Sequence, residues 1–544
     1  MARAAAHVLL VLASRLRALA EAPLRFVRYE QRADGLFLPA VLVLAGLIFG
    51  AVQAGGGAYT AEFDGYADEA AHFMTGLMVR DYLVQWPLPR PLPWAERYYL
   101  HYPKVAFGHW PPLFHLVEAG WWLFVPPSRV TAMLLIGLLG WAAAVCYYRL
   151  MRRYAGSAAA LGMSCLLVAT PVFQMAAGQV MAETLSLLLG VLFLGALIHF
   201  LDEQTARHAA LAGLWCGLAL LVKGTAAYLA VAPFVALVLL GRWRPLLSRA
   251  TAVLLAATFA AGGFWYVLLH VAQRQAIVMM GAMYQRVPWN VLHVLKVAGP
   301  GWLALAAAGA VALLWIRTPA AAACSAILLS GIVGSLVMGA MNEPRHWILA
   351  LPAILLGGVL CLEYIARVRR LRLVAAAAVA CAILVFPWMR YRQQPAGYAE
   401  LSKQIRQPAR MLVSGSPGWS EGSWITLASL RENRPSSVCA RATKLLARSN
   451  WAGNHYKSLV ESTAAVEATL DRLAFDDVIL DDHLPVPMLP HQKLLHEALE
   501  NSAAWKECAA SGKLRAYCRV TPLPKTDRLR IDLKMRLGRI LEEE

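Results

Sequence analysis

Long apolar runs follow one another from residue 36 to residue 388, and charged residues return at ordinary density from residue 389 onward. A helix needs about 20 mostly apolar residues to cross the hydrocarbon core of a bilayer. The first such run, 36–58, contains no charged residue. Further runs occupy 130–149, 158–173, 180–200, 209–221, 225–240, 250–271, 298–315, 320–341, 346–364 and 373–388. The pattern therefore predicts a polytopic α-helical membrane protein with about eleven spans.

The rise in charge density near residue 389 marks the one clear domain boundary. We predict a basic lead-in at 1–35, a transmembrane domain at 36–388 with a large outer loop at 55–129, and a C-terminal α/β soluble domain at 389–544. In the last domain, 410–414 and 477–480 have the pattern of strands. The segments 455–473 and 492–505 have the spacing of amphipathic helices.

Basic residues cluster at alternate ends of the predicted spans. Short cytoplasmic loops carry an excess of Lys and Arg. With the N-terminus inside, four of the five short inner loops are basic, and only 201–208 has no basic excess. This orientation places the outer loop, the turn at 342–345 and the C-terminal domain outside. The absence of Asn-x-Ser/Thr sequons fits a bacterial inner membrane.

The composition agrees with a membrane partner. Only 15% of the residues are charged, and the net charge is +18. In a soluble protein this balance would suggest nucleic acid. Here the arginines stand at span ends, where they meet anionic lipid headgroups. We therefore expect a lipid bilayer and no nucleic acid as partner.

The nine cysteines form no metal-binding spacing. Six lie in or beside apolar spans, where cysteine acts as a small packing residue. Cys508 precedes a predicted turn at 511–512, and Cys518 lies in the predicted strand 514–520 that follows the turn. A disulfide between them is permitted if the domain is outside. Three unpaired thiols, including Cys439, are the equally open alternative.

Ionisable side chains at membrane depth are rare and usually functional. Asp68 and Glu69 follow the first span, in Asp-Gly-Tyr-Ala-Asp-Glu-Ala-Ala-His at 64–72. One carboxylate could accept a proton or bind a metal while the other orients it. A helix N-cap is the plainer interpretation, and it is favoured for the pair alone.

Four further residues mark the predicted outer face. His109 precedes two prolines and could meet a phosphate, although an aromatic belt explains that loop as well. Glu183 heads an apolar helix and needs a partner or a metal, unless it is a solvated end residue. Lys223 stands at a helix break, where snorkelling is the alternative. Arg345 begins a span, and its forked donors can reach an anionic group.

Five motifs in order resemble family 39 of the GT-C glycosyltransferases, the superfamily of protein O-mannosyltransferases and aminoarabinose transferases. They are Ala67-Asp-Glu-Ala70, Pro111-Pro-Leu-Phe114, Ala182-Glu-Thr-Leu185, Leu221-Val-Lys-Gly-Thr225 and Arg345-His-Trp-Ile-Leu-Ala-Leu-Pro352. The resemblance covers roughly residues 36–388. Two departures are Trp110, where some relatives carry Lys, and Glu183, where relatives often carry Asp.

The resemblance implies an inverting transfer of a sugar from a polyprenyl-phosphate-linked donor to an acceptor hydroxyl on protein, lipid or glycan. Asp68 would be the catalytic base, with Glu69 in support. Arg345, Lys223 and His109 would bind the donor phosphate. Glu183 and Asp68 would hold a divalent cation, Mg²⁺ or Mn²⁺. A polytopic carrier for an anionic or lipid-linked solute is the alternative, although carriers commonly show inverted repeats and mid-membrane polar groups.

Overall fold

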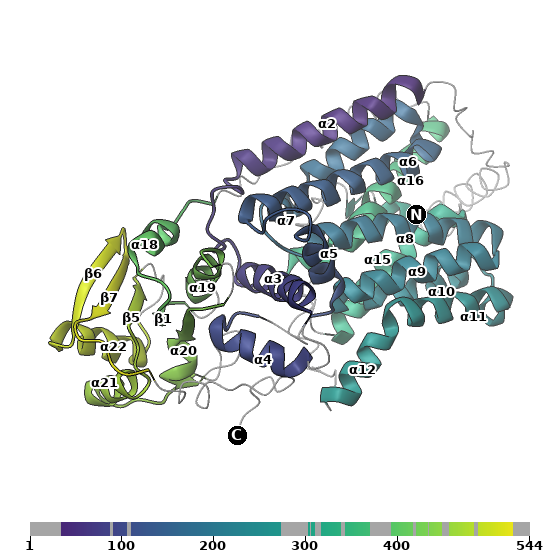
Figure 1. Ribbon diagram of the computed structural model, residues 1–544. Coiled ribbons are helices and arrows are strands. Elements are labelled where there is room, and N and C mark those ends of the chain that lie inside the picture. The colour runs from purple at the N-terminus through teal and green to yellow at the C-terminus, as the bar shows by residue number, and fades with distance from the viewer. Residues whose placement is uncertain are drawn as a thin grey trace, which may run out of the picture. The chain divides into compact units, whose positions relative to one another are not determined.

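The chain is described by a computed structural model (Figure 1), which covers residues 34–86, 91–105, 110–273, 303–304, 306–310, 317–338, 343–369, 393–416, 420–432, 435–448, 456–482 and 488–525. His109, the lead-in up to residue 33, the predicted span 373–388 and most of 298–315 lie outside the described residues.

Packing divides the chain into two compact units. The helical unit consists of Met1–Val52, Gly137–Ala177 and Ala182–Arg390. The mixed unit consists of Gln53–Ile136, Gly178–Met181 and Tyr391–Glu544. The segment predicted as the outer loop therefore groups with the segment predicted as the C-terminal domain.

Apolar helices dominate the helical unit. Among the described residues, five segments are long and apolar enough to cross a membrane: Leu38–Gly55, Arg129–Ala169, Glu183–Glu203, Arg249–Leu268 and Pro344–Leu362. Three shorter apolar segments accompany them: Ala206–Val222, Gly224–Leu239 and Pro319–Ser335. The helices themselves are α2 (Asp34–Gly55), α6 (Arg129–Ala169), α7 (Pro171–Ala177), α8 (Glu183–Glu203), α9 (Ala206–Val222), α10 (Ala227–Leu239), α11 (Arg249–Thr258), α12 (Phe264–Gln273), α15 (Pro319–Met338) and α16 (Leu351–Arg369).

The 41 residues of α6 include two predicted spans, with a kink between them. Gly156 interrupts it with a φ of 76° and a ψ of 167°. Glycine adopts this conformation without the steric cost that a Cβ brings. The break falls between the two apolar runs, 130–149 and 158–173, that the sequence pattern separates.

Small residues let the helices of this unit approach closely. In Figure 1, α8, α9, α10 and α11 run side by side. A Cβ added to Gly213 of α9 would lie 2.3 Å from the Leu254 carbonyl oxygen of α11. A Cβ added to Gly262 would lie 1.9 Å from the Gly217 oxygen. Such contacts between small residues are typical of helices packed in a membrane.

The mixed unit combines helices of the first half of the chain with a C-terminal sheet domain. The former are α3 (Glu69–Gln85), α4 (Pro91–His101) and α5 (Leu113–Trp121). The C-terminal strands are β1 (Arg410–Ser414), β2 (Val438–Arg441), β5 (Asp477–Asp481), β6 (Trp505–Ser511) and β7 (Leu514–Arg519), with a separate pair β3 (Ala447–Arg448) and β4 (Lys457–Ser458). The C-terminal helices are α18 (Tyr398–Gln404), α19 (Ser420–Leu430), α20 (Ala442–Leu445), α21 (Thr463–Arg472) and α22 (Pro490–Asn501).

The five-stranded sheet has the order β2-β1-β5-β7-β6. Strand β1 pairs parallel with β2 and β5, whereas β7 pairs antiparallel with β5 and β6. Residues Val466, Leu470 and Leu495 of α21 and α22 belong to the same buried cluster as Leu412 and Val478 of the sheet. The predicted strands are confirmed, and the two predicted helices are present but shorter.

A disulfide joins the last two strands. Cys508 of β6 is bonded to Cys518 of β7, which confirms the pairing that the sequence left open. Cys439 is a free, buried thiol. The bridge closes the hairpin at the edge of the sheet.

Candidate active site

In the helical unit, two predicted site residues, Lys223 and Arg345, meet at a third, Glu183. It is the first residue of α8 and is 1% exposed. Its Oε1 accepts a hydrogen bond from Lys223 Nζ and lies 3.5 Å from Arg345 Nη1. Arg345 also donates from Nε to Glu343 Oε2 at 2.6 Å. Three motifs spread over the chain thus converge in one ion cluster, which we call the Glu183 cluster (Glu183, Lys223, Glu343 and Arg345).

Local backbone geometry presents the two cations to Glu183. Lys223 ends α9 in an extended conformation, with φ −155° and ψ 132°, so its side chain leaves the helix at the predicted break. Arg345 is the second residue of the 3₁₀ helix Pro344–Ala350, which Pro344 initiates. A Cβ on Gly190 of α8 would lie 3.1 Å from the Leu349 oxygen. Glycine at that point allows α8 to approach the 3₁₀ helix that carries Arg345.

The Glu183 cluster can orient donors toward an anion. The Glu183 side chain is 1% exposed, Arg345 8% and Lys223 19%, so the lysine keeps the most access to solvent or ligand. The buried Glu183 carboxylate holds Lys223 through a charge-assisted hydrogen bond and Arg345 through an ion pair. The first turn of α8 adds the positive end of its helix dipole.

The two cations beside Glu183 bear on the divalent cation that the sequence leads us to expect there. Two cationic groups already meet its Oε1, and a third positive charge at that oxygen would be repelled by both. The Mg²⁺ or Mn²⁺ expected between Glu183 and Asp68 stays a prediction, and the two cations at Oε1 weigh against it at that oxygen.

His199, Glu203 and His208 have potential ligand atoms within 4.8 Å of one another. His199 and Glu203 lie at the far end of α8, about 24–30 Å from Glu183 at about 1.5 Å per residue, and His208 lies in the first turn of α9. Nitrogen ligands of this kind suit zinc better than magnesium. Arg153 contacts His199 and places a positive charge beside the group. These residues are too distant to serve chemistry at Glu183.

Glu69 in the mixed unit is enclosed. It is 0% exposed. Its Oε1 lies 2.7 Å from Arg129 Nη1 and accepts from the Val180 N–H at 2.9 Å. Its Oε2 accepts from the Gly65 N–H at 3.2 Å. Glu69 therefore anchors three segments of the mixed unit.

Asp68 stands one residue before α3, at the N-cap position, and its side chain makes no capping hydrogen bond. Asp68 therefore occupies the N-cap position, but its carboxylate does not cap the helix. Asp68 is half-buried and interacts electrostatically with Lys104, whose pKa it raises. Burial outweighs this effect and, with Arg441, lowers the pKa of Lys104 to about 7.

Lys104 is 1% exposed, and Gly422 of α19 makes room for it. A Cβ on Gly422 would lie 2.6 Å from Lys104 Cε. Beside it, Arg441 Nε donates to Glu421 Oε2 at 2.7 Å, and Thr443 donates to the same oxygen at 2.6 Å. Asp68 thus has a lysine neighbour that can change its charge near neutral pH.

Trp110 takes part in a ring stack. Its indole lies 4.0 Å from the His72 ring at an interplanar angle of 16°. His72 Nδ1 lies 3.1 Å from His115 Nε2. Burial and the neighbouring His72 hold the pKa of His115 well below its usual value. At the position where some relatives carry Lys, this chain therefore has a packing residue.

Sequence reasoning missed Lys104 and Arg129. Neither lies in a motif, and Arg129 reads as an ordinary end of a span. A signal for Lys104 was its position in the outer loop upstream of the Pro pair at 111–112. Only the folded chain reveals that Lys104 is buried and that Arg129 pairs with Glu69.

Comparison with known proteins supports a glycosyltransferase fold. Residues 110–270 match the family model of dolichyl-phosphate-mannose-protein mannosyltransferase. The chain is similar to ArnT from Cupriavidus metallidurans bound to undecaprenyl phosphate, with TM-score 0.58 and 12% identity over 90% of this chain and 99% of that one. It is also similar to the Archaeoglobus fulgidus oligosaccharyltransferase in complex with Zn and sulfate, with TM-score 0.54 and 14% identity over 81% of this chain and 68% of that one. No curated protein sequence matches it.

These matches confirm the resemblance to GT-C glycosyltransferases that the five motifs predict. The fold is mostly helical and ArnT-like, with several apolar helices and a C-terminal domain that contains a sheet. The apolar helices and these similarities support a multi-pass membrane protein.

Proposed function

We propose that this protein is an inverting glycosyltransferase that moves a sugar from a polyprenyl-phosphate-linked donor to an acceptor hydroxyl on the extracytoplasmic face of a bacterial inner membrane. In this proposal the N-terminus is cytoplasmic and the C-terminal domain is outside. The single observation that carries the proposal is the convergence of Lys223 and Arg345 on buried Glu183.

The two cations suit the leaving group of such a reaction. When the bond between the sugar C1 and the phosphate oxygen breaks, negative charge grows on the polyprenyl phosphate. Lys223 and Arg345 stabilise that charge as it develops. Glu183 acts as a positioning residue, because it holds both side chains and keeps their donors oriented.

Asp68 is our candidate for the base. Its carboxylate takes the proton of the acceptor hydroxyl while the acceptor oxygen attacks C1 from the face opposite the phosphate. The attack inverts C1 and releases the polyprenyl phosphate. Glu69 positions the start of α3, since Arg129 and the N–H groups of Val180 and Gly65 occupy its oxygens. Lys104 tunes the charge beside Asp68.

The test uses the full chain in lipid nanodiscs with a panel of polyprenyl-phosphate sugars. Transfer or release of the sugar is compared between wild type, Glu183→Gln and Glu203→Gln. The control lies on the same helix, and its side chain is 51% exposed. We expect Glu183→Gln to lower kcat/KM at least about tenfold, the equivalent of about 1.4 kcal/mol, and Glu203→Gln to leave it unchanged.

Wild-type protein that transfers no sugar from any donor, while it carries the intact donor or another solute across the bilayer, would overturn the proposal in favour of a carrier. Equal transfer by wild type and Glu183→Gln would remove the Glu183 cluster from the mechanism.

A further inference from the structure

A cavity of about 500 Å³ lies within the mixed unit. Its walls come from α3, α4, the segment 123–127 after α5, and the end of α19. A second hollow of about 880 Å³ shares Arg80, Asp81, Tyr98 and Pro435 with it. The two therefore adjoin, and together we call them the α3–α4 cavity. Each volume falls in the range of about 300–1,000 Å³ that small-ligand sites occupy.

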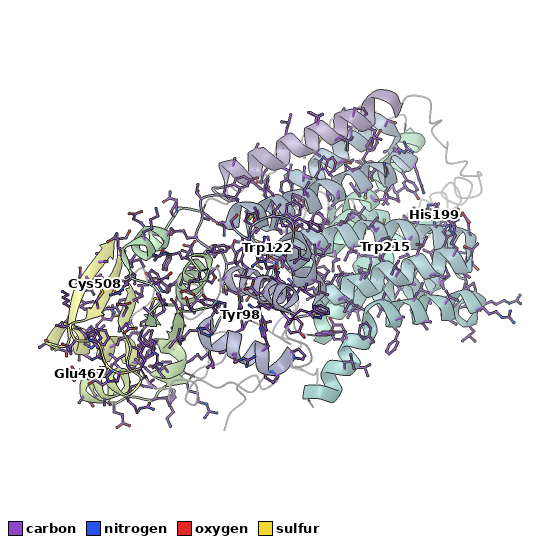
Figure 2. All side chains as sticks on the ribbon, in the orientation of Figure 1. Tyr98, Trp122, His199, Trp215, Glu467 and Cys508 are labelled. Atoms are coloured by element: carbon purple, nitrogen blue, oxygen red, sulfur yellow. A yellow bond between two sulfur atoms is a disulfide. The ribbon has the colours of Figure 1, made fainter. Side chains whose placement is uncertain are left out.

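Aromatic rings form one wall of this cavity. Trp94 and Tyr98 of α4 stack with centroids 5.2 Å apart at 28°. Tyr102 follows Tyr98 at 5.7 Å. Figure 2 labels Tyr98 on α4 and Trp122 at the end of α5, both of which line the cavity. At its rim stands Phe124, which is 87% exposed.

Polar groups stand between the rings. Arg80 Nη1 donates to Asp81 Oδ1 at 2.6 Å, and Tyr98 donates to Asp81 Oδ2 at 3.3 Å. Tyr102 donates to Glu432, and Trp94 donates to Gln85 Oε1 at 3.0 Å. Trp122 is 2% exposed, and its indole N–H has no hydrogen-bond partner among the described residues. An unpaired buried donor calls for an acceptor, which an oxygen of a ligand or of a water in the cavity can supply.

The charged residues that line the cavity indicate which class of ligand it binds. Among the described lining residues, Arg80 and Arg97 are balanced by Asp81 and Glu432. A site built for phosphate would carry an excess of cations, and one for a cation would carry an excess of carboxylates. Flat rings alternating with paired hydrogen-bonding groups suit a neutral ligand that has apolar C–H faces and many hydroxyls. A saccharide has that chemistry.

The distance along α3 between Asp68 and the cavity indicates how long the ligand must be. Leu77 and Asp81, which line the cavity, follow Asp68 by nine and thirteen residues. At about 1.5 Å per residue, they lie about 13–20 Å from Asp68 along the helix. A single sugar ring in the cavity cannot also present a hydroxyl at Asp68. An extended chain of several rings can.

We propose that the α3–α4 cavity binds the non-reacting rings of an uncharged oligosaccharide acceptor. This inference rests on the proposed transferase function. Binding energy from those remote rings would hold the acceptor hydroxyl in place for reaction. The cavity thereby selects a glycan over a protein or a simple lipid as the acceptor.

The test measures direct binding of labelled neutral oligosaccharides of one to six rings to the full chain in nanodiscs, with phosphorylated versions in parallel. The variants are Phe124→Ala, which changes an exposed side chain, and Asp81→Asn, which keeps the shape of the group. Trp243→Ala is the matched control, because Trp243 is 63% exposed and does not line the cavity.

We expect oligosaccharides of three or more rings to bind at least tenfold more tightly than the monosaccharide. Phe124→Ala and Asp81→Asn should each weaken that binding at least tenfold, and Trp243→Ala should not. Binding that is equal in all four proteins, tighter for the monosaccharide, or confined to phosphorylated probes would overturn the inference.

The two proposals fail in distinguishable ways. If the protein transfers sugar to a non-glycan acceptor and binds no oligosaccharide, the cavity assignment falls and the transferase stands. If oligosaccharides bind in the cavity but no donor is ever cleaved, the transferase falls, and with it the claim that the bound glycan is an acceptor.

Discussion

Glu69 and Arg129 form a buried ion pair, with Oε1 and Nη1 2.7 Å apart and side chains 0% and 6% exposed. Arg129 also donates from Nε to the Ala58 oxygen at 2.6 Å and from Nη2 to Gln393 Oε1 at 2.8 Å. The pair therefore ties α3, the start of α6 and the segment at 393 together. It also explains why Glu69, although adjacent to Asp68, has a different task.

Glu69→Ala should destabilise the mixed unit strongly. Removal of one partner leaves the Arg129 charge buried, which typically costs about 3–5 kcal/mol. Thermal unfolding of the purified protein in detergent measures the effect. Glu400→Ala is the control, because Glu400 and Lys403 form a pair whose side chains are 63% and 71% exposed, and such pairs contribute about 0–1 kcal/mol. Equal melting of the two variants would contradict a structural role for Glu69.

Lys104 should make stability depend on pH near neutrality. Its pKa is lowered to about 7 in the folded protein from 10.5, so between these values the unfolded chain holds a proton that the folded protein has released. Stability must therefore rise as pH increases from about 7 toward 10. Lys104→Met removes this contribution.

The measurement is the melting temperature from pH 6 to pH 9 for wild type and Lys104→Met. Lys444, whose pKa burial lowers to about 8, is present in both proteins. We expect a steeper rise with pH in wild type. Parallel curves would mean that Lys104 keeps its ordinary pKa.

The Cys508–Cys518 bridge should be detectable and stabilising. Its sequence separation is 10, and closure of a loop of that size contributes roughly 2–3 kcal/mol in the chain-entropy model. Mass spectrometry of unreduced peptides should find the two cysteines linked and Cys439 free. Cys508→Ser with Cys518→Ser should lower the melting temperature of the protein. Free thiols at 508 and 518 in the native protein would contradict this and would weaken the outside location of the domain.

Sequence periodicity predicts the apolar helices well, because a bilayer demands long apolar runs whatever their neighbours are. It also anticipates the meeting of Glu183, Lys223 and Arg345, since each stands at an end of an apolar run on the same predicted face. Their pairing follows from the cost of leaving an ionised group alone at that depth.

The mixed unit is harder to predict, because its order depends on tertiary contacts. The segment 55–129 is predicted as an outer loop, yet α4 forms within it, with Pro91 and Pro93 at its start, where proline is tolerated. The burial of Lys104 and of Arg129 depends on partners that are remote in sequence. The local pattern of apolar and polar residues does not predict contacts between residues that are far apart in the sequence.

The central claim is that Asp68 acts as the base in sugar transfer, and Asp68→Asn tests it most directly. The measurement is the rate of transfer from a polyprenyl-phosphate sugar, alongside the affinity for polyprenyl phosphate, in wild type and in this variant. We expect the rate to fall by about 10²–10⁴, the usual contribution of a general base, with affinity unchanged. Transfer at the wild-type rate by Asp68→Asn would contradict the account.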